Sequence, residues 1–554
     1  MIGIGLVMIE TGCGSQAGGV SESKSLLGGS GGGSDSGAGN SGGVTVTNIY
    51  SQPKQLGTGD LLYVDLNSSK SLDFAGVESQ SEFIFVVANT SSNSSNFSVQ
   101  INGDLSEAEF DLEEDPTLSK SLAVHAEEVN DITEQFHESL RLKEKELETL
   151  EISSEAESLS MAKSISTGVS PSISEGSEQS FKVLASLSST SSSVSVDAVA
   201  ECVRNNVAFY VDKRVTTEML SSAEVDGFCR QFDETVSKEE ALFGSLSDVN
   251  NDGKVIVLFT PQVNKLGALG GGIVTGFFNA TDLYSNSSSN AASNHMEILY
   301  IMVPDPKGEY GATVSKSFAM SNLIPAVLPH ELQHAISYNQ HVFVNKGSSE
   351  EAWLNEGLSH LAEDMMGQNQ ENPSRYALYL QNPSAYPLTT SKSPNLATRG
   401  GAYLFLRYLY EQAENPKAFL AKLLQSSNTG VRGIEAAFGG RAGDFDQFGE
   451  FFLRWSAALA MTDRGVSQDR RFTYQPRVAD SATGNLSGVC LSCSAQDNRG
   501  TKLSGVSVKS FSGSQSSTTA SSAARFYKVS NVSGKLDFSS SGSTDGFGIL
   551  IRTK

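Results

Sequence analysis

Two histidines four residues apart constrain this chain most strongly. They belong to the segment His330–His334, whose sequence is His-Glu-Leu-Gln-His. On an α-helix, side chains four positions apart lie on one face, so both imidazoles can reach a single ion. Glu331 lies between them, where its carboxylate can accept a hydrogen bond from a water at that ion. The flanking residues are apolar, which predicts a buried helix, and a histidine pair on a solvated helix face is the alternative.

A second helix downstream supplies a candidate for a third ligand. The segment Trp353–Asp364 begins Trp-Leu-Asn-Glu-Gly and contains Glu356. Two neutral imidazoles and one carboxylate suit zinc and leave a coordination position open. A metzincin would require Gly at position 337 and His at position 340, where this chain has Ser337 and Gln340. The sequence therefore favours a carboxylate as the third ligand.

The two motifs together resemble those of the hyicolysin family of bacterial zinc peptidases, and the resemblance extends over residues 195–460. The Trp-Leu-Asn-Glu-Gly segment is also similar to that of aminopeptidase N-like gluzincins. The resemblance implies a secreted metalloprotease with one catalytic zinc. It also implies that the ligands are His330, His334 and Glu356, with Glu331 as the general base.

The chain departs from the aminopeptidase N-like pattern in two places. The Tyr-x-x-Gly-Ala segment of those enzymes corresponds to residues 398–402, which are Thr-Arg-Gly-Gly-Ala and lack the tyrosine. The exopeptidase signature Gly-x-Met-Glu-Asn is absent from the sequence as well. An endopeptidase is therefore expected over an aminopeptidase. A catalytically inactive surface binding protein or adhesin with a retained zincin scaffold is the competing hypothesis, and the presence of Glu331 counts against it.

Other residues near these motifs are candidates for supporting roles. A zinc-bound histidine usually donates its second nitrogen to an oxygen acceptor, and Glu363 and Asp364 are placed for this role. His360, one turn beyond Glu356, could act in the same way or contact the developing oxyanion. The donors considered for the oxyanion are Tyr403, which is favoured, and His360, Arg399 and Tyr376. Core packing is the alternative role for Tyr403, because its neighbours are apolar at helical spacing.

A calcium site is a further possibility at Asp248, Asn250 and Asp252, which with Gly253 match the first half of a calcium-binding loop. The twelfth position is Phe259 and not Glu, so the usual bidentate ligand is missing. A tight turn into the following strand is the alternative.

The N-terminal segment predicts export. Residues 1–12 are mostly apolar and are followed by Cys13, which resembles the end of a bacterial lipoprotein signal. Residues 13–44 are rich in Gly and Ser and would form a flexible tether behind a lipidated Cys13. The expected location is extracellular or on the outer cell surface, with membrane contact only through that lipid. The formal net charge of -23 disfavours nucleic acid, so the expected partners are protein or peptide substrates.

Besides Cys13 the chain has four cysteines, an even number that fits two disulfides in an exported protein. Cys202 with Cys229 and Cys490 with Cys493 is the simplest of three possible connectivities. A redox or zinc role for the Cys-x-x-Cys pair at 490–493 is the alternative.

These observations predict an α+β chain with several parts. A zincin-type catalytic domain would place a β-sheet and the active-site helix before a mainly helical subdomain, with an N-terminal β-sandwich and a small C-terminal β region outside it. Residues 196–212 are expected to form a helix and then a strand, and Pro329 predicts a kink or a helix start. The predicted parts are 1–12 (signal), 13–44 (tether), 45–104 (sandwich), 105–194 (one long exposed acidic helix and a Ser-rich linker), 195–480 (metallopeptidase) and 481–554 (Ser/Gly-rich β region).

Overall fold

A computed structural model describes residues 54–105, 131–152 and 173–554, with gaps at 79, 190, 287–289, 391–393, 439–446 and 496. The predicted signal at 1–12, Cys13 and the tether at 13–44 lie outside the described residues. Helices make up 36% and strands 24% of the structure, so the predicted α+β class is confirmed. In the described ranges, no helix combines the length and the apolar character needed to span a membrane.

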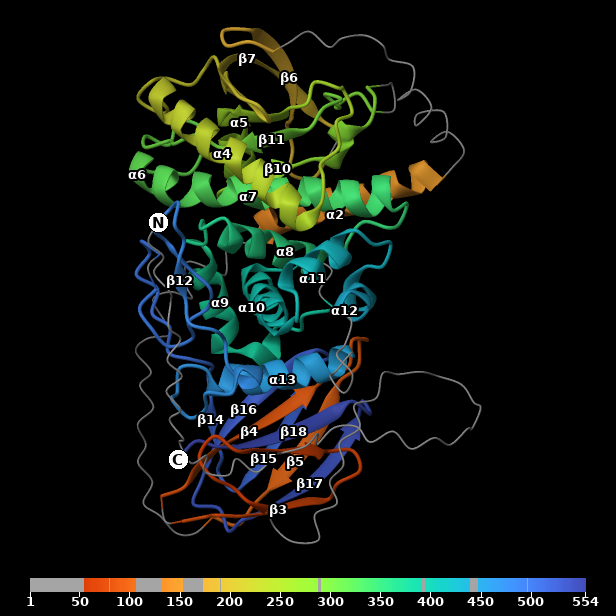
Figure 1. The fold of residues 1–554 in the computed structure, drawn as a ribbon, viewed down its shortest axis with the longest axis vertical. Helices are drawn as coiled ribbons and strands as arrows, with labels where there is room; N and C mark the ends of the chain where they lie inside the picture. The colour runs from red at the N-terminus through yellow and green to blue at the C-terminus, as the bar shows by residue number, and fades with distance from the viewer. Residues whose placement is uncertain are drawn as a thin grey trace, which may run out of the picture.

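The structure has three layers along its long axis, with a sheet at one end, helices in the middle and a sandwich at the other end (Figure 1). The first layer is a mixed sheet of six strands, with helices against it. In spatial order the strands are β10 (Gly276–Phe278), β11 (Ile298–Ile301), β9 (Val255–Phe259), β8 (Val207–Asp212), β7 (Ser193–Val203) and β6 (Glu178–Leu184). The helices of this layer include α4 (Ser222–Phe243), α5 (Pro261–Leu269) and α7 (Ile324–Tyr338).

The central strands β8, β9 and β11 run parallel and are fully buried, as their continuous apolar sequences predict. The helix expected before β8 is wrong, because this segment is the strand β7, which pairs antiparallel with β8. Burial in β7 alternates at Val196, Ala198, Ala200 and Cys202, a period of two that fits a strand and not a helix. The sheet also includes β6, so the predicted domain start at 195 is too late.

The helix α7 carries the His-Glu-Leu-Gln-His segment. It begins at Ile324, so the start expected at Pro329 is about one turn late. Pro325 occupies the first turn, where a missing N–H costs nothing, and Pro329 lies inside the helix. Directly before α7 the backbone forms an irregular turn, the π-helical segment η2 (Ala319–Leu323).

The middle layer is helical, as predicted, and follows α7 directly. Its helices are α8 (Ala352–Met365), α9 (Asn372–Gln381), α10 (Leu396–Gln412), α11 (Pro416–Leu424), α12 (Gly430–Phe438) and α13 (Phe448–Met461). Helix α10 packs on α9 at its own glycine Gly400 and on α8 at Gly357 of that helix. A Cβ at Gly400 would meet the backbone of Arg375 at 2.4 Å, so the helices could not approach as closely with any larger residue.

The third layer is one β-sandwich, built from both ends of the described chain. One sheet has the order β1 (Lys54–Gln55), β3 (Ser71–Ala75), β17 (Lys535–Gly542), β5 (Phe97–Asn102) and β15 (Ser514–Thr519). The other has the order β14 (Lys509–Ser510), β16 (Ala523–Ser530), β4 (Glu82–Asn89), β18 (Gly546–Arg552) and β2 (Leu61–Asp65). The prediction of two separate β units is therefore wrong. Each alone would leave a sheet without its neighbouring strands, and together they close one core.

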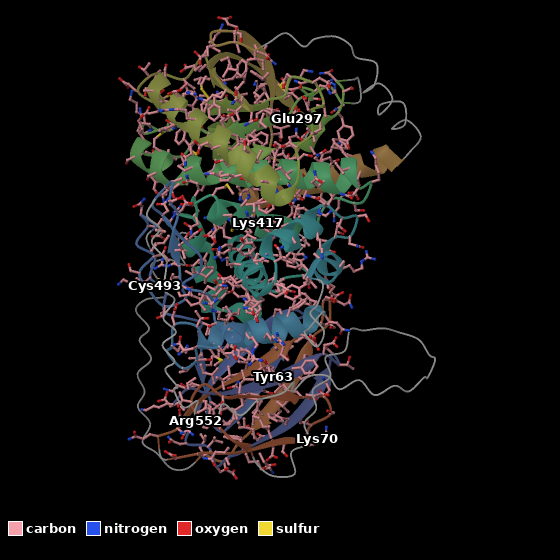
Figure 2. All side chains as sticks on the ribbon, viewed as in Figure 1. Tyr63, Lys70, Glu297, Lys417, Cys493 and Arg552 are labelled. Atoms are coloured by element: carbon pink, nitrogen blue, oxygen red, sulfur yellow. A yellow bond between two sulfur atoms is a disulfide. The ribbon has the colours of Figure 1, made fainter. Side chains whose placement is uncertain are left out.

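The stretch 480–508, assigned to the C-terminal β region, packs instead on the helical layer. Cys493 lies beside that layer, whereas Lys70 and Arg552 lie in the sandwich (Figure 2). The Tyr376 hydroxyl donates to the Cys490 carbonyl at 3.2 Å, and the two cysteines of the stretch are bridged. The predicted boundary at 480/481 is therefore too early.

Residues 131–152 form the predicted helix, α2 (Asp131–Ile152), but its exposure differs from the prediction. Phe136, Leu140 and Leu147 are at most 4% exposed and belong to the main core. They recur at helical spacing, so one face of α2 is covered and the helix is not a free surface element.

The two disulfides have the simplest predicted pairing, Cys202 with Cys229 and Cys490 with Cys493. The first joins β7 to α4 across a sequence separation of 27. Replacing both of these cysteines by Ser should lower the free energy of unfolding by about 3–4 kcal/mol, because the open loop gains entropy in the unfolded chain. Urea unfolding of the double variant measures this. The Cys490–Cys493 disulfide closes a much shorter loop, so the matched replacement of these two cysteines should cost less. An equal loss for both pairs would contradict the loop-length argument.

Candidate metal centre

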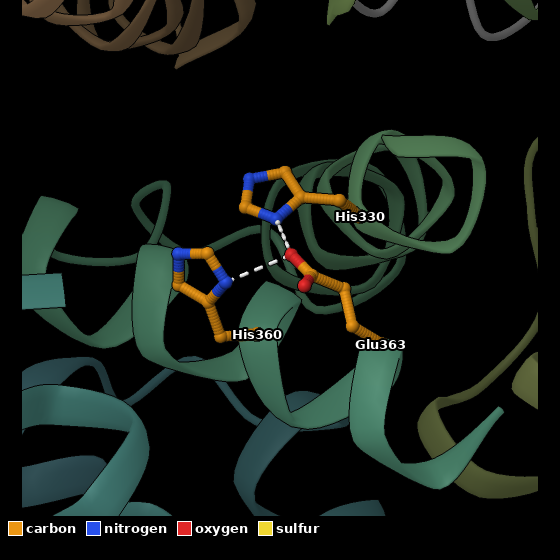
Figure 3. A group of neighbouring side chains, drawn as sticks. All are labelled: His330, His360 and Glu363. Carbon is orange, nitrogen blue, oxygen red and sulfur yellow. Dashed lines mark hydrogen bonds and ion pairs between the residues drawn. The ribbon is translucent and has the colours of Figure 1, made fainter. Parts of the chain in front are cut away.

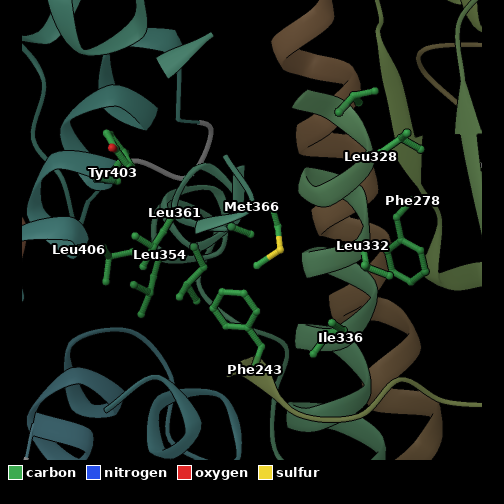
Figure 4. Packing of buried hydrophobic residues seen from close by; sticks show 14 of the residues in the cluster. Phe243, Phe278, Leu328, Leu332, Ile336, Leu354, Leu361, Met366, Tyr403 and Leu406 are labelled. Atoms are coloured by element: carbon green, nitrogen blue, oxygen red, sulfur yellow. The ribbon is translucent and has the colours of Figure 1, made fainter. Parts of the chain in front are cut away.

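The site is built where α7 packs against α8. Leu328 and Leu332 of α7 lie beside Phe278 of β10 (Figure 4). This apolar stripe anchors one side of α7 to the sheet. His330 and His334 lie one helical turn apart on α7, and both face the carboxylate of Glu356 on α8. Their spacing of four residues puts both rings on the side of α7 that meets α8.

The three predicted ligands converge at one point. His330 Nε2 lies 3.5 Å from Glu356 Oε2, and His334 Nε2 lies 3.7 Å from Glu356 Oε1. The ligand atoms of all three residues lie within 4.8 Å of one another, and each residue is buried. Buried His and Glu groups are thus positioned to bind a metal ion.

The charges of these groups also fit a cation. Burial opposes a charge on His330, but hydrogen bonds to the carboxylates of Glu356 and Glu363 outweigh it and raise its pKa to about 9. Burial opposes the charge on Glu356 too, but Arg399 and the two histidines hold its pKa well below the usual value. The carboxylates of Glu356 and Glu363 thus place negative charge beside His330 that a divalent cation would offset.

Glu363 supports His330 at the ring nitrogen Nδ1, whereas Nε2 faces Glu356. Its Oε1 accepts from His330 Nδ1 at 2.7 Å and pairs with His360 Nδ1 at 2.8 Å, as Figure 3 shows. Burial opposes its charge, but His360 and His330 lower the pKa of Glu363 to about 2, so it is a carboxylate at neutral pH. A hydrogen bond of this kind fixes the ring of His330 with Nε2 toward Glu356.

Replacing Glu363 by Gln should weaken metal binding by about 10–100-fold, because the amide orients His330 without the charge of the carboxylate. Competition with a zinc-sensitive dye measures this affinity. Glu371 is the matched control, since it also lines the cavity but pairs with Arg375 and Arg499 and not with a histidine. Equal metal affinities for Glu363→Gln and the unchanged chain would show that Glu363 does not support the site.

His334 is held by residues that sequence reasoning missed. Asn355 Oδ1 lies 3.1 Å from His334 Nδ1, and the Ser359 hydroxyl lies 3.2 Å from the same nitrogen. Asn355 directly precedes Glu356 in the Trp-Leu-Asn-Glu-Gly segment, so its position in that motif was the available signal. Arg399 also enters the site, with Nη1 at 3.2 Å from Glu356 Oε2.

Glu331 points to the same side and is tied to the sheet edge. The backbone N–H of Phe278 on β10 donates to Glu331 Oε2 at 2.9 Å. Burial raises the pKa of Glu331, and the charges of His330 and Arg141 oppose that shift. A raised pKa suits a carboxylate that must accept a proton near neutral pH.

A cavity of about 290 Å³ opens onto these groups. Its polar lining includes His330, Glu331, His360, Glu363, Arg399, Arg375, Arg499, Glu371 and His137, and its apolar lining includes Ile273, Phe318, Leu323, Ala326, Val327 and Leu396. Of the described residues, none hydrogen-bonds to the Nε2 of His360. That nitrogen is itself buried.

Three of the predicted residues do not line the cavity: Tyr403, Tyr376 and Asp364. Tyr403 does not line the cavity, because its ring stacks on Tyr376 at 6.1 Å and is 1% exposed. Burial and the nearby charge of Asp364 raise the pKa of Tyr403 well above its usual value. Asp364 faces Arg407 at 2.8 Å and not a histidine. The favoured role of Tyr403 as an oxyanion donor is therefore wrong, and its apolar neighbours indicate core packing.

The segment at Asp248, Asn250 and Asp252 forms a hydrogen-bonded turn. Asp248 Oδ1 accepts from the N–H of Gly253 at 3.2 Å, and the Asn250 amide donates to Asp252 Oδ2 at 2.8 Å. The candidate His, Cys, Asp and Glu metal groups found in the described ranges all lie at α7 and α8. Calcium at this turn stays a prediction.

The comparisons with known proteins give no assignment, since no protein-family model and no curated protein matches the chain.

Proposed function

We propose that the chain is a zinc-dependent endopeptidase of extracellular location, held at the cell surface by a lipid on Cys13. The observation that carries this proposal is the convergence of His330, His334 and Glu356 at one point, with His330 and Glu331 both lining the same cavity. The donor set of two imidazoles and one carboxylate is the one that zinc takes when a coordination position stays open. Protein or peptide chains are the proposed substrates.

His330, His334 and Glu356 would hold the zinc, which when bound supplies Lewis acidity toward water and the scissile carbonyl. Glu331 accepts the proton of the attacking water and delivers it to the leaving amine. The Phe278 N–H at Glu331 Oε2 leaves the other carboxylate oxygen for the proton. His360 also lines the cavity, with Nδ1 against the carboxylate of Glu363. Burial lowers the pKa of His360 to about 4, so the neutral ring carries its proton on Nδ1 and its Nε2 can only accept. We therefore assign His360 a positioning role through Glu363 and no donor role toward the developing oxyanion.

The substrate position follows from the sheet. Strand β10 is the edge strand and ends at Phe278, the residue that donates to Glu331. An extended peptide can add to such an edge through backbone hydrogen bonds, which would bring its carbonyl to the base. Recognition through the backbone suits an enzyme that cuts within a chain, because neither peptide terminus is then needed.

Cleavage of a peptide blocked at both ends tests this proposal. An acetylated and amidated peptide cut at an internal bond, identified by mass spectrometry, supports an endopeptidase. Cleavage only of the unblocked peptide from one end supports an exopeptidase and contradicts the proposal. Zinc binding with no cleavage of either peptide, both by the full chain and by a variant whose helix α2 is displaced, would instead favour a binding protein with a retained scaffold.

A further inference from the structure

Helix α2 lies beside α7, between the sheet layer and the helical layer (Figure 1). Its buried apolar side chains, Phe136, Leu140 and Leu147, all point to one side of the helix. Leu142 is 55% exposed, and Lys143 forms an exposed ion pair with Glu146. The helix is therefore amphipathic, with its apolar face turned into the protein and its polar face outward.

Contacts hold α2 against both layers. The ring of Phe136 meets that of Phe277, on the edge strand β10, edge to face at a centroid distance of 5.3 Å. Farther along the helix, Glu148 Oε2 accepts from the backbone N–H of Ser349 at 2.6 Å, just ahead of α8. The helix thus bridges the sheet edge and the approach to the ligand Glu356.

The same helix reaches the metal centre. His137 lines the cavity together with His330 and Glu331. Arg141 and Glu144 pair at 2.9 Å and are only 5% and 2% exposed, so α2 brings a buried ion pair to the cleft. A buried pair of this kind adds little to stability, because the desolvation of both groups offsets their attraction.

None of the metal ligands comes from α2. His330 and His334 are on α7 and Glu356 is on α8, and these two helices pack directly on each other. The hydrogen bond from Phe278 to Glu331 likewise needs no residue of α2. The helix can therefore leave the cleft while the ligands and the base keep their supports.

We propose that α2 is an autoinhibitory segment that fills the substrate groove of its own chain. The inference rests on the proposed function, because the groove in question is the one beside β10 where the peptide would lie. With α2 in place, the edge strand and one wall of the cavity are covered. Displacing or excising α2 exposes both to a polypeptide substrate.

A pair of variants on opposite faces of α2 tests this proposal. Leu140→Glu places a carboxylate in the covered apolar face and should release the helix, whereas Leu142→Glu makes the same change on the exposed face. The rate of zinc removal by a chelator reports access to the site without reference to activity. We expect a rise of about tenfold or more for Leu140→Glu and no change for Leu142→Glu.

The rate of cleavage of an unfolded protein gives the second measurement. Leu140→Glu should raise kcat/KM by a similar factor at unchanged zinc content. A synthetic peptide of residues 131–152, added in trans, should inhibit this variant competitively and raise KM. The same peptide carrying Leu140→Glu is the matched control and should not inhibit.

A purely structural role for α2 gives a different result. In that case Leu140→Glu would lower Tm and activity with no gain in chelator access, and the added peptide would have no effect. Phe136→Asp removes the contact with Phe277 and keeps the test valid if Leu140→Glu does not fold. Faster zinc removal without any cleavage would contradict the proposed function and leave the covering role of α2 intact. Cleavage with equal rates of zinc removal in all variants would overturn the autoinhibition.

Discussion

Glu331→Gln should leave one zinc per chain bound and lower turnover by about 10²–10⁴-fold. The amide keeps the size of the carboxylate, and its oxygen can still accept from the Phe278 N–H that now lies 2.9 Å from Glu331 Oε2. It cannot take a proton from water, so only the acid–base step is lost. Zinc content by mass spectrometry and turnover of an unfolded protein substrate, measured on one preparation, separate these two effects.

Glu350→Gln is the matched control for that variant. Glu350 is also a buried carboxyl, but it accepts from the N–H of Gly430 and faces His341 at 3.5 Å, outside the cavity. This substitution should leave kcat within about threefold, because no group at the cavity changes. Full activity in Glu331→Gln would exclude the acid–base mechanism and favour the binding-protein hypothesis. Both variants are also compared in the Leu140→Glu background, so that a covered groove does not mask a difference.

Glu356→Ala should lose both zinc and activity. The substitution removes one of three ligands and leaves His330 without the acceptor that lies 3.5 Å from its Nε2. The loss of affinity should exceed the roughly 10–100-fold typical of a group that only orients a ligand. Isothermal titration of the metal-free variant with zinc measures it, and a high zinc concentration should restore part of the activity by mass action.

The neighbouring carboxylates provide the comparison for Glu356→Ala. Glu363→Ala should bind zinc more weakly than the unchanged chain but more tightly than Glu356→Ala, because Glu363 acts through His330. Glu350→Ala should not change zinc affinity. Full zinc occupancy in Glu356→Ala together with its loss in Glu363→Ala or Glu350→Ala would show that the third ligand is misassigned.

The metal centre could be predicted from the sequence because its geometry is local. The spacing of His330 and His334 is a property of one helix, and Glu356 lies in a second motif shortly after it. Glu363 could be named as a possible support, but which histidine it orients is fixed only when α8 packs on α7 and brings it to His330. The role of Tyr403 could not be predicted from its apolar neighbours in the sequence, because both a core residue and a catalytic residue can have such neighbours. Its burial away from the cavity indicates core packing.

The joining of both ends of the chain in one sandwich and the burial of α2 could not be predicted, because they depend on distant contacts. Asn89 on β4 donates to the carbonyl of Thr519, 430 positions away in the chain, and no local pattern signals that contact. For α2, the many charges indicated an exposed helix, but Phe136, Leu140 and the Arg141–Glu144 pair are covered by other layers. Hydrophobic periodicity identified the helix, whereas its burial depends on a cleft formed by residues far along the sequence.

Zinc content and peptide cleavage followed through one cycle of metal removal test the central claim most directly. The measurement uses the full chain and its Leu140→Glu variant, each assayed as purified, after chelation and after zinc is returned. The account predicts one zinc per chain, internal cleavage of a blocked peptide, loss of both on chelation and recovery of both with zinc. Cleavage that persists in the metal-free chain, or a zinc-loaded Leu140→Glu chain that cleaves no peptide bond, would contradict it.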